Sequence, residues 1–256
     1  GMGTAFAEWL ALIVGLLLVA RVAGASLPAI IARTPRATLL DRARLAALFA
    51  VNRDIMIRTI ALLILFLWFA NAGARLGAAA LAANHILLQF VNFAAFVLDA
   101  FAFTAESRVG NAIGQKDRAR FLKAIRLTSE FSLGSAVLLT SIFLIAGGPI
   151  IAFLAKDAAV VAEARSYLIY AALIPLLGLP SWMLDGIFIG ATRGTALRNA
   201  GVMATVAYVA LDLALRPMGN QGVWLAMTAS FLLRAGGLAL YFPALLRDIG
   251  AKPDAN

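Results

Sequence analysis

Cysteine is absent from the sequence, histidine occurs once, and charged residues are scarce. Without cysteine there is no disulfide framework and no thiolate metal site, and the single His85 excludes a multi-histidine metal site within this chain. The chain also lacks a GxxxxGKS/T phosphate loop and a nucleophile elbow. We therefore expect no enzyme, no cofactor and no ATP hydrolysis by this chain. An ion gradient or a partner would supply the energy for any work.

Long apolar runs make up most of what is present. Hydrophobic residues are 62% of the chain and charged residues only 14%, whereas a soluble domain has roughly 45–50% and about 25%. This composition predicts an integral membrane protein with an all-α fold, because helices satisfy their own backbone groups in lipid. Seven apolar segments are each close to the roughly 20 residues that a spanning helix needs. They are residues 4–20, 55–72, 81–105, 127–147, 167–190, 196–215 and 221–242.

A long polar connection, residues 21–54, separates the first apolar segment from the other six. Pro28 and Pro35 would end or kink helices there. In its second half the apolar residues lie near one face and most charges lie elsewhere, which predicts an interfacial helix leading into the next span. The connection is the best candidate for a boundary between two halves of a larger protein.

Lysine and arginine are distributed very unequally between alternate loops. Sixteen lie in one set of loops, which includes the clusters 33–53 and 108–126 and the C-terminal tail, and four lie in the other set. Cytoplasmic loops carry the excess of positive charge in membrane proteins. We therefore expect the basic loops and the C-terminus to be cytoplasmic and the loops around Arg75 and Lys156 to be external. This asymmetry accounts for the net charge of +9, so we expect no nucleic-acid partner.

A polar and aromatic stripe runs along residues 85–106. Its members are His85, Gln89, Asn92, Phe96, Asp99, Phe103 and Glu106. The histidine, asparagine and two acids recur every seven residues, and such positions drift by only about 20° per heptad, so they share one helix face. An ionised side chain at mid-bilayer costs at least about 2.5–3.5 kcal/mol, which favours a face that lines a cavity or an ion path. The alternative is polar contact between packed helices.

Asp99 and Asp185 are our candidates for coupling transport to an ion. Both lie in apolar surroundings without a basic residue within one helical turn, in the similar phrases LDAFAFTAESR and LDGIFIGATRG. A carboxylic acid in such surroundings can take up a proton from one side of the membrane and release it when a rearrangement rehydrates it. The alternative for each residue is a neutral or hydrogen-bonded packing role.

The segment that carries Asp185 has two further features of a binding site. Pro175 and Pro180 predict a kinked helix just before the acid, and broken helices accompany the binding sites of carriers. Trp182 is a candidate for the cavity wall, since an aromatic face attracts flat cationic compounds.

Two other acids in or near the spans have simpler interpretations. Asp212 precedes Arg216 by one helical turn, which predicts a local ion pair. Glu130 follows Arg126 by one turn near the end of its span, which predicts a solvated or paired end residue.

Five phrases of the chain resemble the multidrug and toxic compound extrusion (MATE) family of transporters, and one branch of it most closely. They are NRDIMIRT at 52–59, GARLG at 73–77, LAANHILLQF at 81–90, LDAFAFTAESRVGNAIG at 98–114 and LDGIFIGATRG at 184–194. Together the phrases are specific, and the spacing of the spans agrees with the family through the C-terminus.

The resemblance implies one half of a twelve-helix transporter whose central cavity lies between two six-helix lobes. Residues 1–20 would be the last helix of the N-terminal lobe, and 21–54 the cytoplasmic connection with its interfacial helix. Residues 55–246 would be the six-helix C-terminal lobe, and 247–256 a cytoplasmic tail. The implied partners are the missing N-terminal lobe, a small-molecule substrate and the lipid of a bacterial inner membrane.

The resemblance also implies a function. Members of the family export organic cations, drugs and toxic metabolites in exchange for protons or sodium, by alternating access. A lipid-linked oligosaccharide flippase is an alternative with the same general architecture, but it would favour a cationic cavity, whereas the predicted cavity is acidic and aromatic. A third possibility is a non-transporting membrane subunit or sensor, complete at seven spans.

Overall fold

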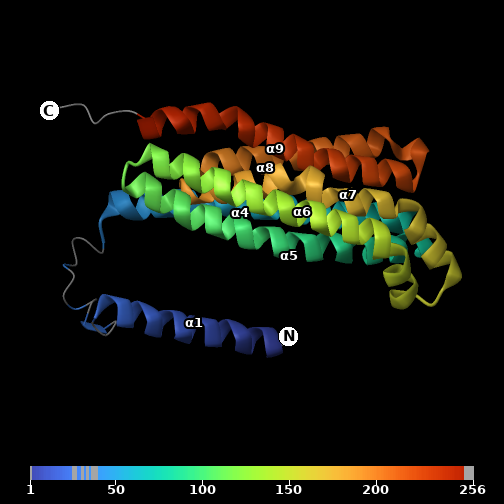
Figure 1. Ribbon diagram of the computed structural model, residues 1–256, viewed down its shortest axis with the longest axis horizontal. Coiled ribbons are helices and arrows are strands. Elements are labelled where there is room, and N and C mark those ends of the chain that lie inside the picture. Colours follow the sequence, from blue (N-terminus) through green and yellow to red (C-terminus); the bar gives the residue numbers. More distant parts are fainter. Residues whose placement is uncertain (1, 25–27, 30–31, 33–34, 36–39, 251–256) are drawn as a thin grey trace. The chain divides into compact units, whose positions relative to one another are not determined.

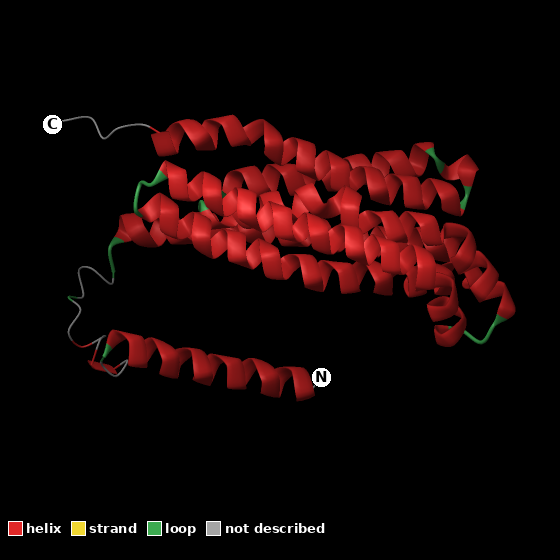
Figure 2. Ribbon diagram, in the orientation of Figure 1, coloured by secondary structure: helices red, strands yellow, loops and turns green. Residues whose placement is uncertain are grey.

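The computed structural model describes residues 2–24, 28–29, 32, 35 and 40–250 (Figure 1). Within these residues the fold is all-α, as predicted, and contains no strand (Figure 2). The helices are α1 (Met2–Ala23), α4 (Arg42–Arg75), α5 (Ala78–Gly114), α6 (Arg118–Leu154), α7 (Ala158–Gly190), α8 (Gly194–Ala214), the 3₁₀ helix η1 (Arg216–Met218) and α9 (Asn220–Gly250).

The chain forms two compact units, residues 1–49 and 50–256. The first contains α1, whose large apolar side chains, among them Trp9 and Leu17, are exposed. Its apolar window has a mean hydropathy of 2.0, so α1 is apolar enough to cross a membrane. The second unit is a helical bundle that contains α5 to α9 and most of α4.

Six of the described helices are long and apolar enough to cross a membrane, namely α1, α4, α5, α6, α7 and α9. They match six of the seven predicted spans. The seventh, α8, has 21 residues and falls outside this group because Arg198, Asn199 and Asp212 lower its hydropathy. It still packs inside the bundle, against α7 and α9.

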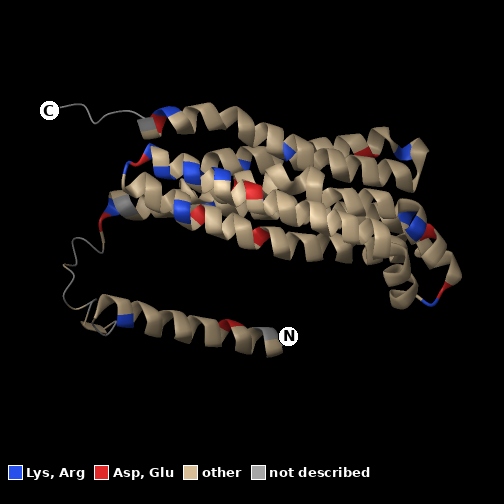
Figure 3. Cartoon of the chain, viewed as in Figure 1, with Lys and Arg blue, Asp and Glu red and all other residues tan. Residues whose placement is uncertain are grey.

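The helices extend well beyond the predicted apolar cores. Both α5 and α6 have 37 residues, which at 1.5 Å per residue gives a length of about 55 Å against a hydrocarbon thickness of about 30 Å. Their ends therefore reach into the headgroup region and water. Charged residues gather toward the ends of the bundle, while its middle carries few of them (Figure 3).

The predicted interfacial helix and the second span form a single element. The helix that begins at Arg42 continues without a break to Arg75 as α4, and the boundary between the two compact units falls within it. The helix is continuous through Asp54, whose side chain is buried.

Helix α7 lies at the centre of the bundle and packs against α5, α6, α8 and α9. It approaches α5 very closely at two glycines, where an added Cβ would overlap the carbonyl oxygens of Ala102 and Glu106 at Gly186 and Gly190 respectively. Small residues permit such backbone contact between membrane helices. Pro175 and Pro180 lie inside α7, which stays helical across both.

The outer surface of the bundle is rich in large apolar side chains. Leu67, Phe131, Ile145 and Leu240 are all more than 65% exposed. Soluble proteins rarely expose apolar surface on this scale, whereas lipid covers it in a membrane. This exposure supports a multi-pass membrane protein.

Turns between the helices alternate between the two ends of the bundle (Figure 1). The turns after α5 and after α7 lie at one end, and those after α6 and α8 at the other. Asp117 and Asp157 cap the helices that follow them, accepting hydrogen bonds from the backbone N–H groups of Arg120 and Ala159. Arg33, Arg36 and Lys252, which contribute to the predicted charge asymmetry, lie outside the described residues, and the orientation in the membrane stays a prediction.

Candidate functional site

Side chains from α4, α5, α7 and α9 line a central cavity of about 370 Å³. This volume lies in the range of roughly 300–1,000 Å³ that small-molecule sites occupy. Its charged lining residues are Arg58, Asp99, Glu106, Asp185 and Arg234, and its aromatic ones are Phe66, Phe103, Trp182 and Phe231. The prediction of an acidic and aromatic wall is therefore incomplete, because two guanidinium groups face the same space.

The structure divides the predicted stripe on α5 into two parts. Asn92, Asp99, Phe103 and Glu106 line the central cavity, together with the predicted Trp182 and Asp185 of α7. His85, Gln89 and Phe96 are not among its lining residues. These three side chains are exposed, and the first two lie 3.4 Å apart, from Nε2 to Nε2, along α5. Four of the seven stripe residues therefore belong to the site, and Phe96 is left out although it lies between Asn92 and Asp99.

Asp185 is held by two arginines from other helices. Its Oδ2 atom forms an ion pair with Nη2 of Arg58 on α4 and lies 3.6 Å from Nη2 of Arg234 on α9. The carboxylate is buried, with 6% of the residue exposed. Asp185 therefore connects α4, α7 and α9 at the wall of the cavity.

Arg234 has a second partner besides Asp185. Its Nη2 atom donates a hydrogen bond of 2.9 Å to Ser181 Oγ, while that hydroxyl donates to the carbonyl oxygen of Gly178. The guanidinium carbon lies 5.5 Å from the centre of the Phe231 ring. The charged side chain is thus fixed in orientation, with 7% of the residue exposed.

The charged groups of this cluster are not fully paired. Among the described side chains, the Nε atoms of Arg58 and Arg234 and Oδ1 of Asp185 are buried without a hydrogen-bond partner. Leaving a buried polar atom unpaired costs about 1–3 kcal/mol, and more for a charged group. The protein therefore maintains unused donors and an unused acceptor beside the cavity.

Asp99 differs from Asp185 in its surroundings. It is only partly buried, and none of the ion pairs or hydrogen bonds found among the described residues involves its side chain. It interacts electrostatically with Asp185, Arg234 and Arg58. Asp99 is thus the more accessible of the two predicted coupling acids, and its carboxylate is available to a ligand or an ion.

Our sequence reasoning missed Arg58 and Arg234 as members of the site. Each lies within an apolar span, where an arginine is costly unless it is paired, and that cost was the available signal. Spacing within one helical turn of the acid could not reveal them, because Arg58 and Asp185 lie 127 positions apart.

The predicted ion pair between Asp212 and Arg216 is wrong. Asp212 Oδ2 instead lies 2.6 Å from Arg75 Nη2 and accepts a hydrogen bond of 2.8 Å from Trp68 Nε1. Both partners come from α4, so the acid joins α8 to α4 rather than closing a local turn. The pair between Arg126 and Glu130 is confirmed, with Nε and Oε1 2.7 Å apart.

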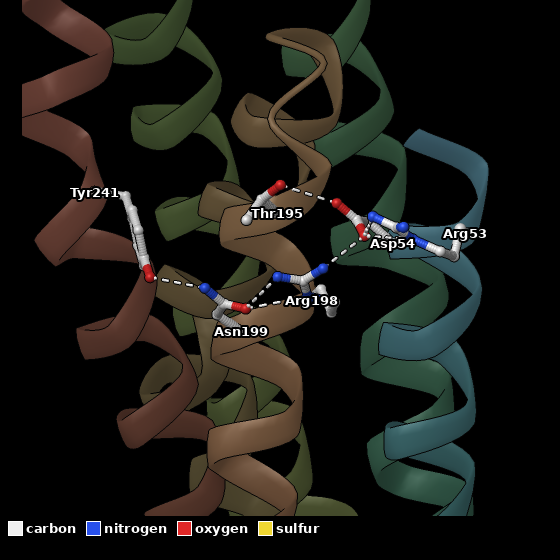
Figure 4. A network of polar contacts seen from close by, with 6 residues as sticks. All are labelled: Arg53, Asp54, Thr195, Arg198, Asn199 and Tyr241. Atoms are coloured by element: carbon white, nitrogen blue, oxygen red, sulfur yellow. Dashed lines mark hydrogen bonds and ion pairs between the residues drawn. The ribbon is translucent and has the colours of Figure 1, made fainter. Parts of the chain in front are cut away.

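A second buried acid, Asp54, organises the opposite end of α4 and α8 (Figure 4). It accepts hydrogen bonds of 2.9 Å from Thr195 Oγ1 and from Arg198 Nη1. The network continues from Arg198 through Asn199 to the hydroxyl of Tyr241 on α9. We did not select Asp54 from the sequence, because it lies in the segment interpreted as a polar connection.

Comparisons with known proteins show which family the chain is similar to. The family described as MatE matches residues 55–217. DNA damage-inducible protein F of Escherichia coli K12 is 35% identical over 238 residues, which cover 93% of this chain and 51% of that protein. It belongs to the branch that the five phrases indicate.

Two solved structures share the fold. The Vibrio cholerae MATE transporter VcmN in its bent form has a TM-score of 0.73 at 15% identity, covering 80% of this chain and 48% of that one. A MOP superfamily transporter from Pyrococcus furiosus has a TM-score of 0.69 at 18% identity, covering 81% and 48%. The chain therefore spans about half the length of the relatives that it matches.

Proposed function

The chain belongs to the MatE family, and from this premise we propose that it supplies the C-terminal lobe of a secondary active antiporter. The antiporter would export organic cations, drugs or toxic metabolites in exchange for protons or sodium ions. A lipid-linked oligosaccharide flippase is not favoured, given the match to MatE.

One observation carries this proposal: five charged side chains line one cavity of a bundle whose core is mostly apolar. Charged groups at membrane depth are costly and mark the pathways of substrates and ions. The aromatic side chains of the same wall provide flat surfaces for a cation. An arrangement of this kind suits a carrier that binds small charged compounds. Among the described residues, the packing of the helices does not by itself require it.

Within this function Asp99 is the better candidate for the coupling acid. A coupling group has to exchange an ion with water or substrate, which requires a carboxylate that is free to take one up. Asp185 already has an ion pair with Arg58 and a second arginine 3.6 Å away. We assign Asp185 to positioning the two guanidinium groups. We assign Asp99 to binding the proton or sodium ion that is exchanged for the substrate.

The antiporter would need a second lobe opposite this cavity. Carriers of this size build their binding site between two repeats and move one against the other. We propose that residues 55–246 act as the C-terminal lobe and residues 1–20 as the last helix of the facing one. Residues 21–54 would form the cytoplasmic connection and 247–256 a cytoplasmic tail, in a bacterial inner membrane.

Reconstitution tests the proposal. The full-length protein is, in this proposal, the antiporter that contains this chain and the facing N-terminal lobe. In liposomes with a pH or sodium gradient it should move a fluorescent organic cation, and collapse of the gradient should stop the movement. The 256-residue chain reconstituted in parallel should insert without transporting, because its cavity lacks the facing wall. Transport by the full-length protein that ignores both gradients, or strong transport by the 256-residue chain, would refute the proposal.

A further inference from the structure

We infer that a groove between the joined ends of α5 and α6 binds the headgroup of an anionic phospholipid. The groove has a volume of about 330 Å³, and its charged lining residues are Arg108 on α5 and Arg120 and Lys123 on α6. The phosphate of the lipid would lie among these three cations, and an acyl chain would lie along α6. The groove is separate from the central cavity, so lipid binding there does not depend on the transport function proposed above.

Helix geometry brings the lining side chains onto one face of each helix. They follow the same spacing, three residues and then four, which keeps side chains on one helix face. They are Arg108, Asn111 and Gln115 on α5 and Arg120, Lys123 and Leu127 on α6. Because α5 and α6 are antiparallel and joined by a short turn, the two faces meet across the groove. Ala112 and Ala124 are buried at its floor, where their small side chains leave room for a ligand.

The groove carries positive charge that its own side chains do not neutralise. None of the described residues that line it is acidic. Arg120 is held in place by Asp117, with Nε 3.1 Å from Oδ2, and by Gln115, whose Oε1 accepts a hydrogen bond of 2.7 Å from Nη1. Within the described part of the chain, the side chains of Arg108 and Lys123 have neither an ion pair nor a hydrogen bond. Two unpaired cations beside an oriented guanidinium suit a phosphate, which accepts charge-assisted hydrogen bonds from both kinds of group.

The topology of the chain does not require this convergence of charge. Basic residues recur along the first turns of α6 (Figure 3), and an excess of lysine and arginine is all that a cytoplasmic loop needs. Lys116 and Arg118 contribute to that excess without lining the groove. Basic pockets between membrane helices at the cytoplasmic side bind anionic lipid headgroups, and this is the side that we expect for this end of the bundle.

The groove lies on the side of α5 that faces away from the central cavity. Asp99 lines the cavity, and Arg108, nine residues later, lines the groove. At about 100° per residue, nine residues place the two side chains on opposite faces of the helix. The facing lobe proposed above would lie opposite the cavity, so the groove stays accessible to lipid.

Exposed apolar side chains continue the groove toward the middle of α6. Leu127 lines the groove, and Phe131 and Leu138, four and eleven residues later on the same face, are exposed. Eleven residues rise about 16 Å, roughly half of the hydrocarbon thickness of about 30 Å. An acyl chain can therefore lie along this face while its headgroup is in the groove, which favours a phospholipid over a free phosphate.

Lipid binding by the full-length protein tests this site. Phosphatidylglycerol and phosphatidylcholine with identical acyl chains both carry a phosphate, but only the first has a net negative charge. Delipidated protein in a nonionic detergent would be titrated with each lipid, and the first bound lipid would be quantified by native mass spectrometry. Phosphatidylglycerol should bind at least about tenfold more tightly, because the three cations attract its net charge and repel the choline group.

Matched variants separate the groove from the general charge of this end of the bundle. Arg108→Gln combined with Lys123→Gln removes the two unpaired cations and should abolish the preference for phosphatidylglycerol. Lys116→Gln combined with Arg118→Gln removes the same charge outside the groove and should keep the preference within about twofold. Asn111→Trp keeps every charge but fills the groove from an exposed position, so it should weaken phosphatidylglycerol binding about tenfold. This variant tests the site even if the Arg108 and Lys123 double variant fails to fold.

Several outcomes would overturn the inference. Equal binding of the two lipids by the wild type would do so, as would unchanged binding by Asn111→Trp. An equal loss in the two double variants would indicate diffuse attraction by the charged loops instead of a site. Inorganic phosphate at the concentration of the lipid should not displace it, because phosphate lacks acyl chains, and displacement would make the occupant a soluble anion. No gradient is present in these measurements, so a failure of transport in liposomes would leave their result unchanged.

Discussion

Arg58 on α4 and Asp185 on α7 lie 127 positions apart in the sequence and form an ion pair at the wall of the central cavity. Asp185 is almost completely buried, and the side chain of Arg58 is mostly so. Removal of one partner from a buried pair leaves an uncompensated charge and costs about 3–5 kcal/mol. The pair is therefore both a structural connection between two helices and the charged centre of the site.

The first prediction concerns this pair. Arg58→Gln and Asp185→Asn should each lower the melting temperature of the purified protein in detergent. The double variant should be less destabilised than the sum of the two, because it leaves neither charge unpaired. Asp99→Asn is the matched control and should change the melting temperature little, since Asp99 has no described ion pair. Strict additivity of the two single variants would show that the pair contributes no interaction energy.

The second prediction tests the corrected partner of Asp212. Arg75→Gln and Asp212→Asn should be coupled by about 0.5–3 kcal/mol in a double-mutant cycle, as expected for residues in contact. Arg216→Gln should show no coupling to Asp212→Asn, although it is closer in sequence. Coupling to Arg216 instead of Arg75 would restore the local ion pair that the spacing predicts.

These two cases show how far local spacing predicts the site. Asn92, Asp99, Phe103 and Glu106 could be assigned to one cavity wall because they share a face of a single helix, and helix geometry relates sequence positions to faces directly. The partners of Asp185 and Asp212 could not be predicted in this way, since each pair joins two helices. Their identity depends on which helices pack together and at what height.

The helices themselves were more predictable than their ends. Continuous apolar segments of about 20 residues predicted the spans, but hydropathy contains no signal for polar turns of helix that continue into water. The first turns of α4 were therefore interpreted as a separate helix. The close approach of α5 and α7 at Gly186 and Gly190 was also missed, because a glycine in a membrane span has several structural roles.

The third prediction concerns this close approach. Gly186→Ala should destabilise the bundle by about 1–3 kcal/mol, because the added methyl group overlaps the carbonyl of Ala102 and separates α5 from α7. Gly236→Ala is the matched control, since an added Cβ there meets no atom within 4 Å. Thermal unfolding of both variants in one detergent measures the difference. Equal stability of the two variants would contradict the packing described.

The fourth prediction concerns orientation. The chain has no cysteine, so single cysteines can be introduced without altering any native thiol. In whole cells an impermeant maleimide should label Lys156→Cys and should not label Lys116→Cys until the membrane is permeabilised. The reason is that Lys116 lies in the arginine- and lysine-rich set of loops, which we expect to be cytoplasmic. Labelling of the Lys116 position in intact cells would reverse the assigned topology.

The central claim is that Asp99 exchanges the coupling ion while Asp185 stays engaged with Arg58 and Arg234. The most direct measurement is dye transport by the full-length protein in liposomes, recorded over a series of pH and sodium gradients for wild type and for Asp99→Asn. The account predicts that the Asn variant folds and binds the dye, but that its transport no longer responds to the gradient. An Asp99→Asn protein with the gradient dependence of the wild type would contradict the claim.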